Sequence, residues 1–125
     1  YKIDSLARLE REVFGPILHV VAFAGDRLDE VIEAINKTGY GLTLGIHSRI
    51  DSKAEYIVNR LRVGNTYVNR NMIGAVVGVQ PFGGEGLSGT GPKAGGPHSL
   101  NRYAVERAVS VNIAAQGGDP ELLNL

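Results

Sequence analysis

The stretch ILHVVAFAGDRLDEVIEAINKTGYGLTLGIHSRIDSKAEYIVNRLRVGNTYV, residues Ile17–Val68, decides the fold. It alternates short apolar runs with longer segments whose apolar residues recur at helical spacing. This alternation is typical of an α/β layer in which helices cover mainly parallel strands. The sequence therefore predicts a fold of the α/β class in this region.

Three apolar runs in this stretch predict strands. Ile17–Phe23 is almost continuously apolar, which suits a strand buried on both faces. Leu42–His47 predicts a second strand, and Thr66–Val68 predicts a short third one. The strands of this layer should be mainly parallel, because helices alternate with them.

The two segments between these strands predict helices. In the first, Asp26 or Asp29 is expected to cap the N-terminus, and Gly39 and Gly41 to end the helix. The second should begin at residues 51–52, with Ser52 and Glu55 at the spacing of a capping box. Their apolar faces consist of Leu28, Val31, Ile32 and Ile35 in the first helix, and Ala54, Ile57, Val58 and Leu61 in the second.

Composition narrows the possible classes of function. The chain has 125 residues, enough for one domain with a modest core. Thirteen basic and thirteen acidic residues cancel, so the charge indicates neither a nucleic-acid partner nor an anionic membrane. No apolar run is long enough for a membrane span, and charges interrupt any signal-peptide pattern in residues 1–25. We therefore expect a cytoplasmic protein.

The chain contains no cysteine. Disulfides, zinc–thiolate sites and a cysteine nucleophile are thus excluded within it. Its histidines, His19, His47 and His98, do not have the spacing of metal ligands, and we expect no metal site.

A glycine-dense segment follows the predicted strands: NRNMIGAVVGVQPFGGEGLSGT, residues Asn69–Thr90. Such a loop usually uses its backbone for tight turns or to approach a ligand. Residues 84–89 fit the pattern G-x-G-x-x-G of dinucleotide-binding proteins, which requires a strand before it and a helix after it. Pro81-Phe82-Gly83 precedes the pattern and Thr90-Gly91-Pro92 follows it, so neither context fits.

Two motifs resemble the aldehyde dehydrogenase superfamily. EVFGP, Glu12–Pro16, resembles its E-x-F-G-P motif, and PFGG, Pro81–Gly84, is shared with it as well. The segment Met72–Gln80 resembles the substrate loop of glutamate semialdehyde (pyrroline-5-carboxylate) dehydrogenases, most nearly the form in bifunctional proline utilisation A flavoproteins. The resemblance implies that residues 1–125 are the C-terminal portion of an incomplete, three-layer α/β catalytic domain of the aldehyde dehydrogenase type.

The resemblance also implies site residues. Glu12 would accept hydrogen bonds from the nicotinamide-ribose hydroxyls, and Phe14 would pack near the nicotinamide of NAD. The backbone amides of Gly74 and Ala75 would bind the α-carboxylate of the substrate, and Phe82 would pack on its aliphatic part. Small residues suit this role, because they let several N–H groups converge on one carboxylate. The plainer alternative is a surface glutamate, a core phenylalanine and an ordinary turn beside one buried aromatic.

The implied reaction is oxidation of L-glutamate γ-semialdehyde to L-glutamate with NAD, in proline catabolism. A cysteine nucleophile and a glutamate base would lie upstream, so the chain alone should be inactive and supply no catalytic residue. FAD would belong only to the proline dehydrogenase half of a bifunctional parent. Val105–Ile113 resembles a strand that forms homo-oligomers in this superfamily, although its alternation also fits an ordinary edge strand. The alternatives are an aldehyde dehydrogenase of other specificity and a non-catalytic assembly module.

Overall fold

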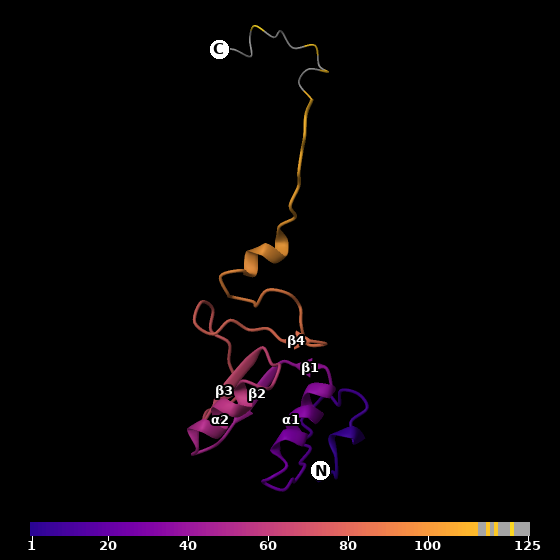
Figure 1. The fold of residues 1–125 in the computed structure, drawn as a ribbon, viewed down its shortest axis with the longest axis vertical. Helices are drawn as coiled ribbons and strands as arrows, with labels where there is room; N and C mark the ends of the chain where they lie inside the picture. The colour runs from indigo at the N-terminus through magenta and orange to yellow at the C-terminus, as the bar shows by residue number, and fades with distance from the viewer. Residues whose placement is uncertain (113–114, 116, 118–120, 122–125) are drawn as a thin grey trace.

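The computed structural model describes residues 1–112, 115, 117 and 121. It is a mixed α/β structure with short strands and two α-helices (Figure 1). In chain order, the elements are η1 (Leu6–Arg8), α1 (Leu28–Lys37), β1 (Tyr40–Gly41), β2 (Thr43–Ile46), α2 (Asp51–Val58), β3 (Asn65–Val68), β4 (Glu85–Gly86) and η2 (Ser99–Tyr103).

The centre of the structure is a β-α-β unit. Strands β2 and β3 pair in parallel, from Thr43 opposite Asn65 to Ile46 opposite Val68, and α2 connects them. This confirms the second and third predicted strands and their direction. A second pair is antiparallel: β1 lies beside β4, with Tyr40 opposite Gly86.

The predicted strand Ile17–Phe23 is wrong. Within it only Val20 forms a β-bridge, to Lys2, and the remaining residues have no regular structure. Leu18 is 73% exposed and Phe23 52% exposed, so the segment is not buried either. A strand needs a neighbour along its whole edge, and among the described residues this segment has backbone partners only at residues 1–3, opposite Leu18 and Val20.

Both helices are confirmed, but the predicted caps are wrong. The N-cap residues are Arg27 and Ile50, and neither makes a capping hydrogen bond with its side chain. Asp29 lies in the first turn of α1, and Ser52 lies within α2. Arg27 instead donates from Nε to Glu30 at 2.8 Å, and this hydrogen bond lowers the pKa of the Glu30 carboxyl. Helix α1 ends as predicted, before a Gly39 with φ of 75°.

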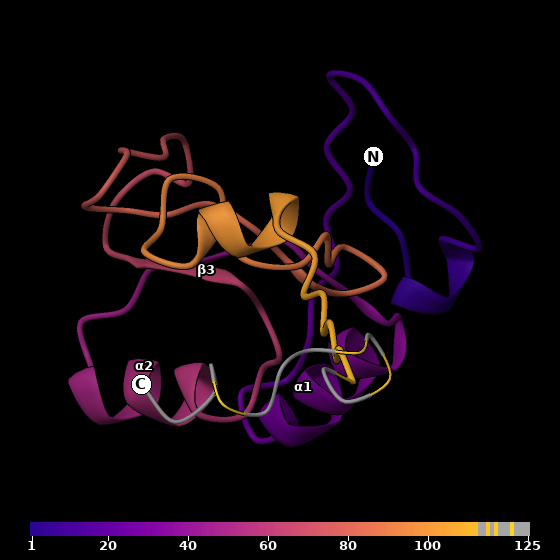
Figure 2. The same ribbon diagram turned by 90° about the horizontal axis from the view of Figure 1, so that it is seen from above.

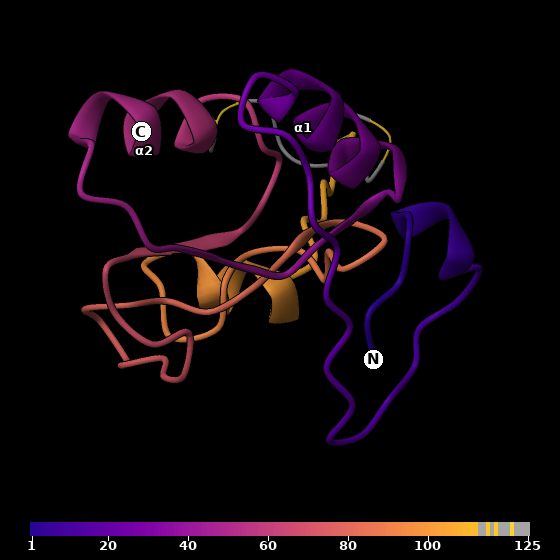
Figure 3. The ribbon, with the colours of Figure 1, turned by 90° about the horizontal axis from the view of Figure 1, so that it is seen from below.

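A polar cluster explains why Asp29 does not cap α1. Its carboxylate accepts a 2.5 Å hydrogen bond from the Tyr56 hydroxyl of α2 and lies 3.5 Å from Arg60 Nη1. The Arg60 guanidinium stacks 4.2 Å from the centre of the Tyr56 ring. Figures 2 and 3 show α1 and α2 on one side of β3, with the glycine-rich segment on the other. The cluster therefore joins the two helices within one layer.

The core between the helices and the strands is small. It consists of Ile32, Ile46, Ala54, Leu61 and Tyr67. The accessible surface is 10548 Å² for a mass of 13.3 kDa, whereas a self-contained monomer of this mass exposes about 6,500 Å². This chain thus buries far less of its surface than an independent domain does. Among the described residues, no helix is long and apolar enough to cross a membrane.

Residues 105–112, the described part of the predicted strand Val105–Ile113, form no strand within the single chain, and Ile113 lies outside the described residues; a strand formed with another subunit stays a prediction. This segment leaves the body after η2 as an arm without regular structure (Figure 1). Val105 is 92% exposed and Val109 69% exposed. Alternation of apolar and polar residues is not sufficient for a strand, because a strand also needs a neighbour.

Candidate functional site

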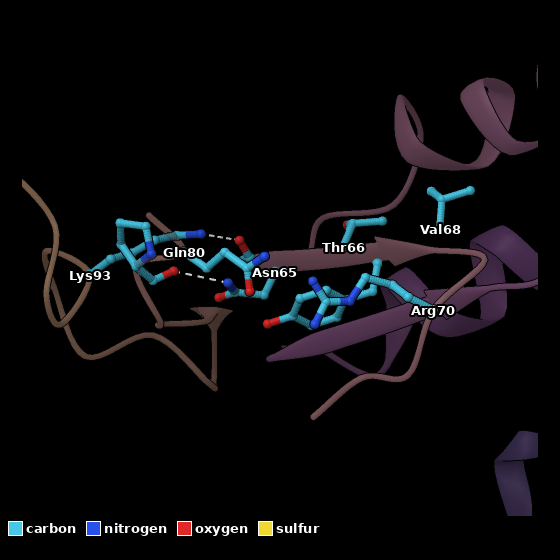
Figure 4. Close-up of a pocket in the computed structure, with 9 residues that line it drawn as sticks. Asn65, Thr66, Val68, Arg70, Gln80 and Lys93 are labelled. Carbon is cyan, nitrogen blue, oxygen red and sulfur yellow. Dashed lines mark hydrogen bonds between the residues drawn. The ribbon is translucent and has the colours of Figure 1, made fainter. Parts of the chain in front are cut away.

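Asn65, the first residue of β3, holds the P-F-G-G segment. Its side chain is buried, with 8% of the residue exposed. Its Nδ2 donates to the carbonyl oxygen of Pro81 at 2.9 Å, and its Oδ1 accepts from the amide of Gly83 at 3.1 Å. Figure 4 shows Asn65 at the start of the strand, beside Gln80 and Lys93 of the glycine-rich segment. The two bonds therefore hold the backbone on both sides of Phe82.

The backbone of Phe82 is held from its other edge as well. Its amide donates to the carbonyl of Ala94 at 3.0 Å, and the amide of Ala94 donates back at 2.8 Å. Lys93 Nζ donates to the carbonyl of Gly64 (Figure 4). A Cβ on Gly64 would overlap the carbonyl oxygen of Gly83, so only glycine permits this close approach. Phe82 is half-buried in this setting.

The Gly74–Ala75 turn is positioned by β2 and β3. The Tyr67 hydroxyl donates to the Gly74 carbonyl at 2.8 Å. Met72 lies over Gly45 of β2, where an added Cβ would stand only 2.7 Å from Met72 Sδ. Gly74 has φ of 119°, a conformation that other residues rarely adopt. The sequence pattern had marked the turn, and the structure shows what holds it.

The amides of Gly74 and Ala75 form no hydrogen bond with any other described residue, and both residues are exposed. Two successive free N–H groups in a glycine turn can bind an anion such as a carboxylate. The structure thus leaves available the groups that the predicted role requires.

The G-x-G-x-x-G pattern does not form a dinucleotide-binding turn. Its β4 residues pair with β1, and Ser88 Oγ accepts from the Gly41 amide at 3.1 Å. The Leu87 amide donates to the Gly39 carbonyl at 2.9 Å. No helix begins between residues 87 and 98. The motif therefore attaches the loop to the body; the sequence context had indicated only that it does not bind a dinucleotide.

Glu12 and Phe14 lie on the exposed N-terminal segment. Phe14 is 91% exposed, and the Glu12 carboxylate forms no ion pair or hydrogen bond with another described residue. A free carboxylate and an uncovered ring fit the ribose hydroxyls and the planar ring of NAD. The structure does not bring them together with Gly74 and Phe82, however. The N-terminal segment lies at the α1 end of the body, whereas the 69–82 loop lies at the opposite end, next to β3 (Figures 1 and 2).

A cavity of about 390 Å³ lies between β3 and the glycine-rich segment (Figure 4). Its lining includes two cations, Arg70 and Lys93, and the guanidinium of Arg70 stands 5.0 Å from the centre of the Tyr67 ring. Within the described part of the chain, no three His, Cys, Asp or Glu side chains lie close enough together to hold a metal ion.

Sequence reasoning missed three residues that build the site: Asn65, Tyr67 and Lys93. One sign of the site was present in the sequence: Asn65 is a polar amide at the start of the predicted strand region, and in the structure it is the first residue of β3. A buried amide must find hydrogen-bond partners, but the sequence does not show which ones.

Comparison with known proteins gives the same family from sequence and from structure. The aldehyde dehydrogenase family profile matches residues 4–109. The chain is 56% identical over 124 residues to the bifunctional protein PutA of Klebsiella aerogenes, covering 97% of the chain and 10% of that protein. It superposes with a TM-score of 0.81 on a variant of Bradyrhizobium japonicum proline utilization A (PutA), 64% identical, covering 93% of this chain and 12% of the other.

A third match is 1-pyrroline-5-carboxylate dehydrogenase from Thermus with bound NAD. Its TM-score is 0.65 and its identity 42%, over 74% of this chain and 18% of the other. The chain thus spans about a tenth of the length of the PutA relative, and the activity of that whole protein is not shown for it. The chain belongs to the aldehyde dehydrogenase family, and it is similar to one part of the PutA proteins.

Proposed function

We propose that the chain is the C-terminal part of the three-layer α/β catalytic domain of an NAD-dependent L-glutamate γ-semialdehyde dehydrogenase, in a bifunctional protein of the PutA type. The observation that carries this proposal is the pair of exposed, unbonded amides at Gly74 and Ala75. The same loop contains Phe82, whose backbone is held by hydrogen bonds on both edges. The similarity to PutA and to a 1-pyrroline-5-carboxylate dehydrogenase supports it.

The two parts of the loop divide the recognition of the substrate. The amides of Gly74 and Ala75 bind the α-carboxylate, a task for which converging N–H groups are well suited. Phe82 packs on the aliphatic carbons, where an aromatic ring removes apolar surface from water. Neither part contacts the reacting aldehyde carbon, so both contribute binding and orientation of the substrate rather than chemistry.

NAD, when bound, supplies the oxidising power for the aldehyde. Glu12 would hold the ribose hydroxyls of NAD and Phe14 would pack beside its nicotinamide; both residues are exposed. FAD belongs to the proline dehydrogenase half of the longer protein, and we assign no residue of this chain to it. The nucleophilic cysteine comes from elsewhere in that protein, since this chain has no cysteine, and we assign the general base to the upstream part as well. The isolated chain is therefore inactive.

We place the longer protein in the cytoplasm as a homo-oligomer. Residues 105–113 are its oligomerisation strand, and a neighbouring subunit supplies the strand partner that the described residues 105–112 lack in the single chain. The exposed valines of the arm are the surface that such a partner would cover.

The test is NADH formation by the full-length protein with glutamate γ-semialdehyde and with pentanal, a neutral aldehyde of the same chain length. A strong preference for the semialdehyde supports carboxylate binding at Gly74 and Ala75. Equal rates would leave an aldehyde dehydrogenase of other specificity. No NADH from either substrate would leave a non-catalytic assembly module and refute the proposal.

A further inference from the structure

Three asparagines use the same pair of hydrogen bonds to join distant segments. Asn36 donates to the Arg60 carbonyl at 2.9 Å and accepts from the Arg62 amide at 3.1 Å. Asn69 donates to the Ser48 carbonyl at 2.9 Å and accepts from the Ser48 amide at 3.0 Å. Asn65 makes the equivalent pair to Pro81 and Gly83, and it is the one buried polar residue in the described part of the chain.

The two hydrogen bonds of Asn65 differ from those of Asn36 and Asn69, because the groups they bind lie on either side of Phe82. The amide and carbonyl of Phe82 itself bond to Ala94 on one edge. The carbonyl before Phe82 and the amide after it bond to the Asn65 side chain on the other edge. In a sheet, two neighbouring strands would satisfy these alternate edges. Here a single side chain replaces one of those strands, and it fixes the backbone on which the Phe82 ring is carried.

We infer that Asn65 is a positioning residue for the substrate: it holds Phe82 against the aliphatic part of the aldehyde. This inference rests on the proposed function, because it assumes that Phe82 contacts the substrate. Without the amide, the carbonyl of Pro81 and the buried amide of Gly83 lose their partners, and the segment must shift to satisfy them. A shift of the segment carries Phe82 with it.

The test is a double-mutant cycle in the full-length protein, with Asn65→Ala and Phe82→Ala made singly and together. We expect Asn65→Ala to raise KM for the semialdehyde about tenfold, as loss of roughly one buried hydrogen-bond pair would, with a smaller change in kcat. In the Phe82→Ala background, the same substitution should raise KM less than about twofold, because its effect passes through the missing ring.

Asn36→Ala is the matched control. It removes the same two kinds of hydrogen bond, to a carbonyl and to the amide two residues later, but at α1 and away from the loop. Its effect on KM should stay within about twofold and should be the same with and without Phe82. An Asn65→Ala effect that multiplies fully with that of Phe82→Ala would show a purely structural role and overturn the inference. An unchanged KM in Asn65→Ala would overturn it as well.

If Asn65→Ala does not fold, Asn65→Asp replaces it in the double-mutant cycle. Its carboxylate keeps the volume and the acceptor for Gly83 but lacks the donor to Pro81, so the same rise in KM is expected. Hydrogen exchange at the Gly83 amide separates this inference from the proposed function. It should accelerate in Asn65→Ala, which removes the acceptor of the Gly83 amide, without substrate present and whichever aldehyde the enzyme oxidises. Unchanged exchange would refute the positioning role even where the semialdehyde is the substrate.

Discussion

The hydroxyl of Tyr67 donates a 2.8 Å hydrogen bond to the carbonyl oxygen of Gly74, seven residues further along the chain. Tyr67 is only 5% exposed, so β3 reaches the turn through a side chain that is itself rigidly packed. The direction of the Gly74 carbonyl determines where the next amide, that of Ala75, points. A core residue of the strand therefore orients the proposed carboxylate site.

Tyr67→Phe should weaken carboxylate recognition without removing the packed ring. We expect KM for glutamate semialdehyde to rise several-fold, on the order of the loss of one hydrogen bond, and KM for pentanal to stay unchanged. Steady-state kinetics of NADH formation measure both constants. Tyr40→Phe is the control, because the Tyr40 hydroxyl bonds to no other described residue. A similar change in that variant would contradict the argument.

Ala75→Leu should affect the two aldehydes differently. The bulky side chain obstructs access to the amides at the exposed turn, so semialdehyde oxidation should lose at least about tenfold in kcat/KM, whereas pentanal, which has no carboxylate, should lose little. The ratio of the two kcat/KM values is the measurement. Equal losses would mean that the turn does not bind the carboxylate.

Phe82→Ala should affect both aldehydes alike. Semialdehyde and pentanal share the aliphatic carbons on which the ring would pack, and loss of that apolar contact should raise KM on the order of tenfold or more. The same kinetic assay tests this. Unchanged KM values would remove Phe82 from the substrate site, and a change confined to the semialdehyde would assign it to carboxylate recognition instead.

Changing each of three isoleucines to alanine should lower the free energy of unfolding, and the loss should be larger the more buried the isoleucine is. Ile32 is 4% exposed, Ile57 is half-buried and Ile50 is 58% exposed. Ile32→Ala should cost about 2–5 kcal/mol, Ile57→Ala less, and Ile50→Ala least. The shift in the urea unfolding midpoint measures the order. A larger effect at Ile50 than at Ile32 would refute the assignment of the core.

The contribution of Tyr56 to stability, at the contact between α1 and α2, should depend on pH in the alkaline range. Its hydrogen bond to the Asp29 carboxylate, together with desolvation, raises the pKa of the phenol above the ordinary value of 10.0. Because the pKa in the folded state exceeds that in the unfolded state, this contribution to stability is complete below about pH 10 and is lost as the pH rises through the raised value.

The difference in unfolding midpoint between the native chain and Tyr56→Phe measures this effect. It should be constant through neutral pH and should shrink above about pH 10. Asp29→Asn should return the pKa of Tyr56 toward its ordinary value, as followed by ultraviolet difference titration. A difference that grows at alkaline pH would have the wrong sign.

Local sequence patterns predicted the elements whose partners lie nearby in the chain. The helices around Ile32 and Ala54 follow from their apolar spacing, and the parallel pairing of β2 with β3 follows from the single helix between them. The apolar run at residues 17–23 did not form the predicted strand, and residues 105–112 form none within the single chain, because neither a continuous nor an alternating apolar pattern shows whether a second strand is present. Asp29 failed as a cap because Tyr56 of α2 and Arg60, two residues beyond the end of that helix, compete for its carboxylate.

The candidate site divides in the same way. The glycine-dense sequence of residues 69–90 identified Gly74, Ala75 and Phe82 as candidate site residues. Their roles in binding stay predictions. The residues that hold them could not be found from sequence, because Asn65 reaches a carbonyl 16 positions away. Such a contact depends on the path of the whole intervening loop, which no local spacing encodes.

The three asparagine side chains that join distant segments, those of Asn36, Asn65 and Asn69, carry no charge. Amides do not titrate in the physiological range, and salt does not screen a hydrogen bond between neutral groups as it screens an ion pair. The positions of the loop beside Phe82 and of the helix–strand connections should therefore be insensitive to acidity and ionic strength. Of the exposed ion pairs between described residues, Arg27 with Glu30 lies outside these contacts, whereas Arg60, which pairs with Asp29, also accepts the Asn36 hydrogen bond through its backbone carbonyl. Changes in buffer conditions should consequently act on substrate charge and on helix ends while the geometry of the loop stays constant.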